Sequence, residues 1–135
     1  MSQKNVELVR QGFEAFNRGD RVIVTRLLAP DVKWHSLAGP ILGVGTLRGR
    51  DAVLEFFWRD LPESIEGFRA SLEEVTDLAN DRVLVVARYE GHGRGSDIEV
   101  NQLVASVYEI RDGMAASVRD YESKDEALEA AGLRE

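Results

Sequence analysis

Four consecutive segments in the second half of the chain alternate between apolar and polar residues, and this pattern constrains the fold more than any other feature. The segments are residues 68–79, 82–93, 98–110 and 114–122. A two-residue period places successive side chains on opposite faces of a β-strand. Short turn sequences join the segments, such as Asn80-Asp81 and Asp112-Gly113. Because such joints leave no room for crossovers, the sequence predicts an antiparallel meander.

The first half of the chain shows helical spacing instead. Residues 3–18 and 50–61 carry broad apolar faces, and a shorter helix is predicted within residues 20–30. Residues 31–37 alternate like a strand, and a short helix is predicted at 123–133. Helices segregated from an antiparallel sheet make an α+β fold. We expect a cone-shaped curved sheet, with three helices across its concave face and a short C-terminal helix.

Composition limits the partners of the chain. The 135 residues suffice for one domain, 1–135, and 17 Lys and Arg against 24 Asp and Glu give a formal net charge of −7. Nucleic acids and anionic membranes need clustered basic residues, so neither is an expected partner. The absence of cysteine excludes disulfides and cysteine-bound metals. Without a signal peptide or a long apolar run, the chain is predicted to be cytoplasmic.

A glycine-rich stretch, WHSLAGPILGVGTLRGRD, covers residues 34–51. Its GVGTLRG part is one residue too long for the G-x-G-x-x-G motif, and no parallel strand–helix–strand unit surrounds it. A phosphate-binding loop is therefore disfavoured. Two interpretations remain: a flexible rim or lid, or a plain loop whose glycines allow tight turns.

Several segments together resemble a known family. These are FEAFNRGD, LAPDVKWH, LRGRDAVLEFF and EIRDGMAASVRDYES. The chain resembles the SnoaL-like branch of the nuclear transport factor 2-like superfamily over essentially its whole length. The resemblance implies the cone fold and a homodimer. It does not choose a function, because that superfamily contains cyclases, isomerases, epoxide hydrolases, dehydratases and non-catalytic binding proteins.

Alternation also predicts which side chains enter the cone. They combine aromatic rings with a few polar groups, as small-molecule sites do. The predicted ligand-binding residues are Phe13, Phe16, Trp34, Ser36, Phe56, Phe57, Tyr89, Gln102, Ser106, Tyr108, Val118 and Glu122. We therefore expect a small apolar or aromatic organic ligand, with no cofactor and no metal.

Comparing this sequence with branches of the superfamily limits which residues could act as acid or base. The tyrosine and two aspartates of ketosteroid isomerases would fall on Phe13, Ser36 and Ser106 here, which lack that chemistry. Limonene-type epoxide hydrolases need two carboxylates flanking an arginine, and only one buried carboxylate is predicted. SnoaL-type cyclases use an aspartate, and Asp120 is the best carboxylate for that role. In an apolar cavity its pKa should rise. The alternative is a solvated or hydrogen-bonded aspartate without catalytic function.

His35 is the second catalytic candidate, because histidine titrates near neutral pH. Alternation points it away from the cone, although a bulge beside Ser36 would turn it inward toward Asp120 or Tyr108. The other interpretation is a hydrogen-bonded structural histidine. The sequence thus leaves three functions open. The first is a cyclase-, isomerase- or hydrolase-type enzyme that uses Asp120 with help from His35, Tyr89 or Tyr108. The others are a non-catalytic ligand-binding protein and an interaction module whose cavity is filled by its own side chains.

The outer face of the predicted sheet is also apolar. Leu103, Ala105 and Val107 alternate with the cavity-facing residues of the same strand. A sheet buried on both faces needs a second cover. We expect that cover to be the same face of a second copy, in a homodimer, or else the short C-terminal helix alone.

Overall fold

One sheet organises the molecule, in a computed structural model that describes residues 2–37 and 45–132. Over that part of the chain the sheet has six strands in the order β2-β1-β6-β5-β4-β3. The predicted meander is confirmed: four antiparallel neighbours follow one another along the chain. They are β3 (Ile65–Ala79), β4 (Arg82–Gly93), β5 (Glu99–Arg111) and β6 (Met114–Tyr121).

Two tight turns fix the register of this meander. Asn80 and Asp81 join β3 to β4, and Asp112 and Gly113 join β5 to β6; all four have φ between 55° and 75°. Positive φ at both central residues is typical of the two-residue turns whose twist matches that of the flanking strands. Asn, Asp and Gly tolerate this conformation better than other residues.

The first strand of the chain departs from the antiparallel pattern. β1 (Leu28–His35) pairs with β6 in parallel, and β2 (Leu47–Arg48) pairs with β1 antiparallel. The strand also begins earlier than predicted. Leu28 already has extended φ and ψ of −102° and 132°, and Pro30 disfavours helical geometry at the residue before it.

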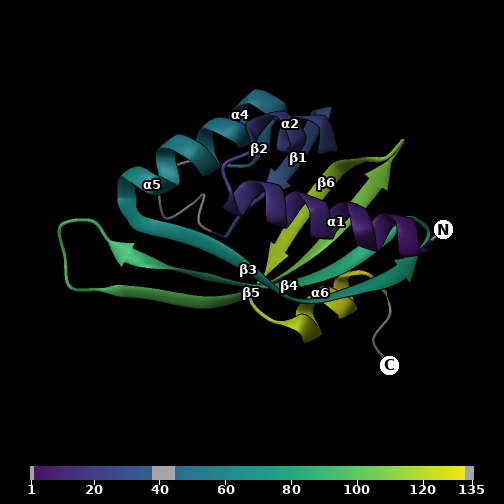
Figure 1. The fold of residues 1–135 in the computed structure, drawn as a ribbon. Helices are drawn as coiled ribbons and strands as arrows, with labels where there is room; N and C mark the ends of the chain where they lie inside the picture. Colours follow the sequence, from purple (N-terminus) through teal and green to yellow (C-terminus); the bar gives the residue numbers. More distant parts are fainter. Residues whose placement is uncertain (1, 38–44, 133–135) are drawn as a thin grey trace.

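Helices cover the sheet unequally (Figure 1). One side carries α1 (Ser2–Asn17), α2 (Arg21–Leu27), α4 (Arg50–Glu55), η1 (Phe56–Asp60) and α5 (Leu61–Ser64). The other side carries α6 (Lys124–Ala130), which contacts β4, β5 and β6. This arrangement confirms the α+β fold with helices across the concave face of a curved sheet.

The predicted helix at 50–61 contains a π-helical turn. The Leu61 N–H donates to the Phe56 carbonyl, five residues earlier, across η1. Pro62 follows directly, and it has no N–H to offer the carbonyl four residues before it. We attribute the wider turn to this proline. The turn buries both Phe56 and Phe57.

Two hydrophobic clusters lie on opposite faces of the sheet. The inner cluster, under the helices, includes Val32, Phe56 and Val118, each 0% exposed. The outer cluster is much smaller and has Leu84, Ala105 and Ala127 at its centre. Among the described residues, no helix is both long and apolar enough to span a membrane.

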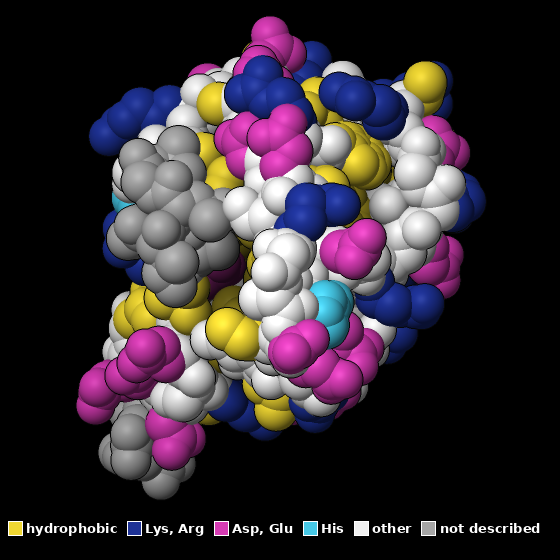
Figure 2. Space-filling model, turned by 90° about the vertical axis from the view of Figure 1, so that its left-hand side faces the viewer, with side chains coloured by type: hydrophobic (Ala, Val, Ile, Leu, Met, Phe, Trp, Pro, Cys, Tyr) yellow, Lys and Arg dark blue, Asp and Glu magenta, His cyan; other side chains and the backbone are white. Residues whose placement is uncertain are grey.

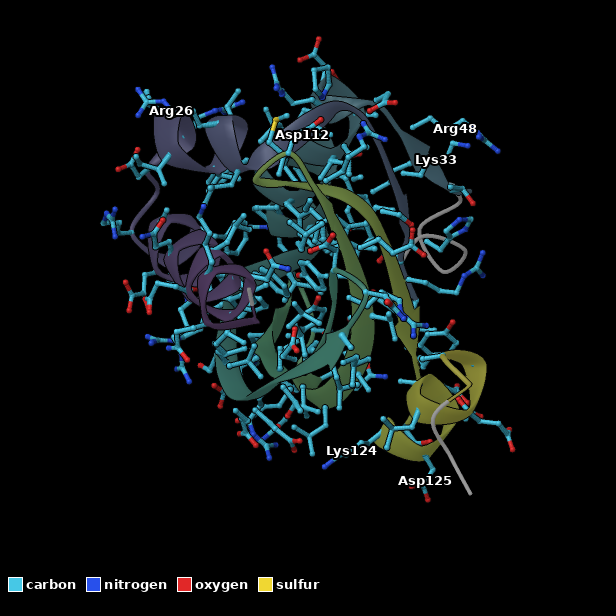
Figure 3. All side chains as sticks on the ribbon, turned by 90° about the vertical axis from the view of Figure 1, so that its right-hand side faces the viewer. Arg26, Lys33, Arg48, Asp112, Lys124 and Asp125 are labelled. Atoms are coloured by element: carbon cyan, nitrogen blue, oxygen red, sulfur yellow. The ribbon has the colours of Figure 1, made fainter. Side chains whose placement is uncertain are left out.

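Charged side chains surround this core. Acidic and basic groups are intermingled on the face shown in Figure 2, around a hollow bordered by hydrophobic side chains. Lys33 and Arg48 are cross-strand neighbours on β1 and β2, and Figure 3 shows both on the outside of that sheet edge. Lys124 and Asp125 project from α6 in the same view.

Candidate functional site

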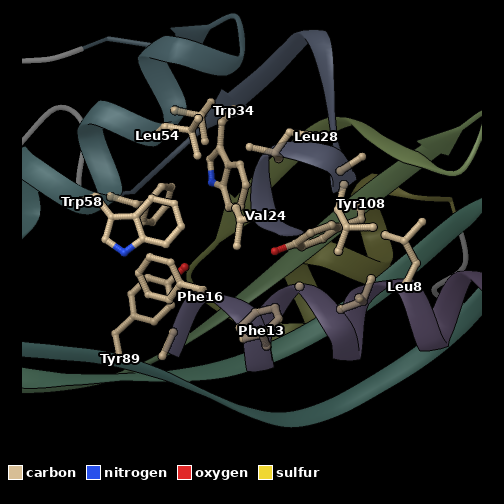
Figure 4. A pocket seen from close by; sticks show the side chains of 17 residues that line it. Leu8, Phe13, Phe16, Val24, Leu28, Trp34, Leu54, Trp58, Tyr89 and Tyr108 are labelled. Atoms are coloured by element: carbon tan, nitrogen blue, oxygen red, sulfur yellow. The ribbon is translucent and has the colours of Figure 1, made fainter. Parts of the chain in front are cut away.

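A cavity of about 90 Å³ lies between the concave face of the sheet and the helices (Figure 4). Its wall is almost entirely apolar. Six of the predicted ligand-binding residues line it: Phe13, Phe16, Trp34, Phe57, Tyr89 and Tyr108. Helices α1 and η1 supply the phenylalanines, and strands β1, β4 and β5 supply the other three.

The aromatic rings of the wall pack edge against face. Phe16 contacts Phe57 with ring centroids 5.9 Å apart at 85°, and Trp34 meets Tyr108 at 5.7 Å and 75°. Such T-shaped pairs bring the positive edge of one ring to the negative face of another. At Trp58 the guanidinium of Arg21 lies 5.1 Å from the ring centroid, which is cation–π distance.

Asp120 is the buried carboxylate beside this wall. It is 6% exposed and pairs in register with Ser106 on β5. The Ser106 hydroxyl donates to Asp120 Oδ1 at 2.7 Å, and the Leu37 N–H donates to Oδ2 at 3.3 Å. Burial raises the pKa of Asp120 to about 6, although both hydrogen bonds and the nearby Trp34 indole pull it down.

Two tyrosines share the region of this carboxylate. Tyr108 is 8% exposed; Tyr89 is half-buried as a whole, but its hydroxyl lies inside the protein. Burial, and then the charge of Asp120, raise the pKa of both phenols. Both hydroxyls therefore keep their protons at neutral pH and remain hydrogen-bond donors.

Comparisons with known proteins identify the family to which the chain belongs. A family model described as SnoaL-like domain matches residues 9–118. The chain belongs to the SnoaL-like domain family. A search of curated proteins finds no match.

Solved structures similar to this SnoaL-like domain cover nearly its whole length. Bal32a, from a soil-derived mobile gene cassette, is 27% identical over 96% of both chains, with a TM-score of 0.79. An NTF2-like protein of unknown function from Burkholderia pseudomallei is 27% identical over 93% of this chain and 95% of its own, with a TM-score of 0.75. TerC, co-crystallised with polyporic acid, is 23% identical over 96% and 97%, with a TM-score of 0.75.

Four more predicted site residues of the SnoaL-like domain are buried but lie behind the cavity wall. They are Ser36, Phe56, Ser106 and Val118. Ser106 still contributes, because it holds Asp120 through its hydroxyl. Val118 pairs in register with both Trp34 and Tyr108, so it lies between these two residues of the wall on the middle strand.

Two predicted site residues require correction, because Gln102 and Glu122 are exposed. Gln102 lies opposite Tyr89 near the end of the β4–β5 hairpin, which extends past the helices in Figure 1. Glu122 follows the last residue of β6, where its backbone N–H donates to Glu126 Oε1 at 3.2 Å. Alternation predicts the face of the strand on which each side chain lies. The helices do not cover that face at these two positions, so the side chains are exposed.

His35 also lies away from the cavity, so the inward-facing base proposed from the sequence is withdrawn. It pairs with the exposed Arg119 on β6, and its Nδ1 lies 2.8 Å from the Thr46 hydroxyl oxygen. Burial lowers the pKa of His35 first, followed by the positive charges of Arg119, Arg48 and Lys33. The imidazole is therefore neutral at pH 7 and hydrogen bonded, as the structural interpretation predicts.

Sequence reasoning missed part of the wall. Leu8, Val24, Leu28 and Trp58 all line the cavity. Leu8 was detectable, because Leu8, Gly12 and Phe16 recur at four-residue spacing and all three line the cavity. Trp58 belongs to the broad apolar face predicted for residues 50–61, but nothing local to the sequence shows that this face borders a hollow.

The described residues bear on two further expectations, the flexible rim or lid and the absence of a metal. Part of the glycine-rich stretch, residues 38–44, lies outside the described residues, so the predicted lid stays a prediction. Within residues 2–37 and 45–132, no group of three or more His, Asp or Glu side chains is placed to hold a metal ion.

Proposed function

We propose that this SnoaL-like domain binds a small, largely apolar or aromatic organic molecule in the cavity, and that Asp120 is the acid–base group of a reaction on it. The observation that carries this proposal is a buried carboxyl, with its pKa raised to about 6, beside an aromatic cavity. Perturbed titratable groups next to apolar pockets are typical of functional sites. TerC, co-crystallised with polyporic acid, and a putative polyketide cyclase from Sinorhizobium meliloti share this fold.

The chemistry that fits Asp120 is proton transfer at a carbon next to a carbonyl group. In an aldol-type ring closure, the Asp120 carboxylate takes a proton from that carbon. The resulting carbanion attacks a second carbonyl of the same molecule, and the new alkoxide receives the proton back from Asp120. A pKa near the working pH serves both half-steps, because the group then gains and loses its proton with little driving force either way.

A non-catalytic ligand-binding protein is the second candidate. It is favoured by the position of Asp120, which is held by Ser106 and Leu37 and does not itself line the cavity. In that case the carboxylate orients the polar end of the site without reacting.

Binding is tested by filling the cavity. A Cβ at Gly12 would meet only the end of the Leu27 side chain, at 3.8 Å, so Gly12→Leu projects into the hollow. Thermal-shift and calorimetric screens with aromatic ketones and terpenoids should find ligands of the unmodified protein that Gly12→Leu no longer binds. The matched control is Gln11→Leu, which adds the same side chain at the exposed neighbouring position of α1. Equal binding by both variants would contradict the proposed site.

Catalysis is tested with Asp120→Asn on any ligand that the protein converts. We expect ligand affinity within about threefold of the unmodified protein and turnover reduced by about 10²- to 10⁴-fold, the usual contribution of a general acid–base group. Unchanged turnover would refute the catalytic role and leave the binding protein as the function.

We also propose a homodimer through the outer face of the sheet. Helix α6 covers only part of that face, and Leu103 on β5 remains 43% exposed. Sedimentation at several concentrations tests the dimer, and Leu103→Lys should shift it toward monomer. A monomer over the whole concentration range would contradict this assembly.

A further inference from the structure

The Trp34 indole carries a buried hydrogen-bond donor without an acceptor. Trp34 is 8% exposed, and its Nε1 has no hydrogen-bond partner in the part of the chain that the structure describes. Buried donors are nearly always paired in native proteins, because leaving one unpaired forfeits the hydrogen bond it made with water. This exception therefore calls for an explanation.

Among the described residues, the surroundings of the Trp34 ring are largely aromatic and offer its N–H no well-placed acceptor. Its ring neighbours are Phe57, at 4.9 Å between centroids, and Tyr108, which meets it edge-on at 5.7 Å. The indole N–H lies close enough to the Asp120 carboxyl for a weak, poorly aligned hydrogen-bonding interaction, the smallest of the effects on the pKa of that carboxyl, but it does not reach the geometry of a formed hydrogen bond. Asp120 instead uses its oxygens on Ser106 and Leu37.

The unpaired donor belongs to the wall of the cavity. Trp34 is one of the lining residues, and Figure 4 shows its ring reaching from β1 into the hollow, with the nitrogen on the inner edge. The hydroxyls of Tyr89 and Tyr108 also point into the hollow in this view. The polar groups offered to an occupant are therefore one indole N–H and two protonated phenols.

We propose that the ligand of this cavity carries a neutral acceptor oxygen, the carbonyl of an aromatic ketone or quinone, which accepts a hydrogen bond from Trp34 Nε1. The inference rests on the proposed function, in which the cavity holds a small molecule. It adds the chemical class of the ligand and the residue that orients it.

The other ligand classes fit these groups less well. A hydrocarbon leaves the Trp34 N–H unpaired, and an amine or ammonium ion presents further hydrogens to it. An anionic ligand brings a second negative charge close to Asp120 inside an apolar wall, where an unpaired charge is costly. A cavity of about 90 Å³ also favours molecules of one ring over polycyclic ones in the conformation seen here.

Two probes of nearly equal shape test the proposal: acetophenone, and α-methylstyrene, in which a CH₂ group replaces the carbonyl oxygen. The chain has two tryptophans, so ¹⁵N-tryptophan labelling gives two indole N–H signals, and Trp58→Phe assigns them. We expect acetophenone to move the Trp34 indole proton downfield and α-methylstyrene to leave it without such a shift. With Trp34→Phe, the affinity for acetophenone should fall about threefold to tenfold, while that for α-methylstyrene stays within about twofold.

The outcomes separate this inference from the proposed function. If both probes bind but the Trp34 signal responds equally to them, or Trp34→Phe weakens both equally, the ring only packs and the inference is overturned while the binding function stands. If neither probe binds while the broader screen finds ligands that lack an acceptor oxygen, the inference is overturned and the binding function stands; if that screen also finds no ligand, both fail. Should Trp34→Phe not fold, the indole signals of the unmodified protein decide the matter.

Discussion

The two faces of the sheet differ in what they bury, although strand β5 contributes side chains to both. On β5, Ser106 and Tyr108 face the helices, whereas Ala105 and Val107 face α6. The inner face combines a large hydrophobic cluster, a cavity and a buried carboxylate. The outer face carries a small hydrophobic cluster, and beside it an ion pair between Arg88 and Glu73 at 2.7 Å.

The difference follows from what covers each face. Several helices span the inner face, and large aromatic side chains hold them off the sheet, so a hollow remains. The seven-residue α6 lies against the outer face through the small side chain of Ala127, which brings helix and sheet close together. The apolar cavity of the inner face therefore lies where bulky rings separate the helices from the sheet.

The largest loss of stability is expected from a substitution on the inner face of the sheet. Phe56 is 0% exposed within the inner cluster, so Phe56→Ala should lower the free energy of unfolding by about 3–5 kcal/mol. Chemical denaturation measures it. The control is Val22→Ala on α2, where the side chain is 63% exposed and the expected change is below about 0.5 kcal/mol. Similar losses for both variants would show that the inner cluster does not dominate stability.

Removing the charge of the buried Asp120 carboxyl should have the next largest effect on stability. Unlike the loss of Phe56, this change should make the protein more stable. Because the pKa of Asp120 rises from 3.8 to about 6 on folding, the native state binds this proton more tightly than the unfolded state. The group therefore lowers stability as pH rises from about 4 to 6, and the penalty persists above pH 6. Asp120→Asn should raise the free energy of unfolding at pH 7.5 by about 1–3 kcal/mol.

This gain should disappear below about pH 4, where Asp120 is protonated in both states. Thermal unfolding between pH 3.5 and 8 measures the difference. Asp97→Asn, at an exposed loop position, should show no comparable gain at pH 7.5. A gain that is independent of pH would mean that the effect does not come from the ionisation of Asp120.

The outer face should tolerate a disruptive change better. Ala127 is 0% exposed under α6, so Ala127→Glu should undock this short helix. Because undocking is local, we expect a loss of only about 1–2 kcal/mol and unchanged ligand affinity. Calorimetry of ligand binding checks the second part, with Ala130→Glu at an exposed position of the same helix as the control. A lost ligand site would show that the two faces are coupled.

The smallest effect on the stability of the folded subunit is expected at Leu103. Since this side chain is 43% exposed, Leu103→Lys should change the free energy of unfolding of the monomer by less than about 0.5 kcal/mol. The measurement is denaturation at a concentration where sedimentation shows monomer only. A larger loss would mean that Leu103 is packed within the subunit instead of being available to a partner.

The sequence predicted the meander and most of the inner wall because both follow from local patterns. Alternation puts Trp34, Tyr108 and Asp120 on the concave side without any knowledge of packing. It fails for Gln102 and Glu122, because the point where the wall ends depends on how far the helices reach over the sheet. That reach is a tertiary property.

Local sequence patterns also could not predict which distant segments pair in the sheet. The parallel pairing of β1 with β6 joins residues more than eighty positions apart, such as Trp34 and Val118. No turn chemistry connects them. The unpaired Trp34 N–H follows from this pairing, because a sequence shows that a donor is present but not whether an acceptor reaches it.

The most direct test of the account is the pKa of Asp120 in the folded protein, measured by the pH titration of its side-chain carboxyl ¹³C signal and assigned with Asp120→Asn. The account predicts a midpoint near 6, because burial beside the aromatic cavity outweighs the hydrogen bonds from Ser106 and Leu37. A midpoint at or below the ordinary value of 3.8 would contradict it, since the carboxyl would then be a solvated or fully paired group without acid–base capacity near neutral pH.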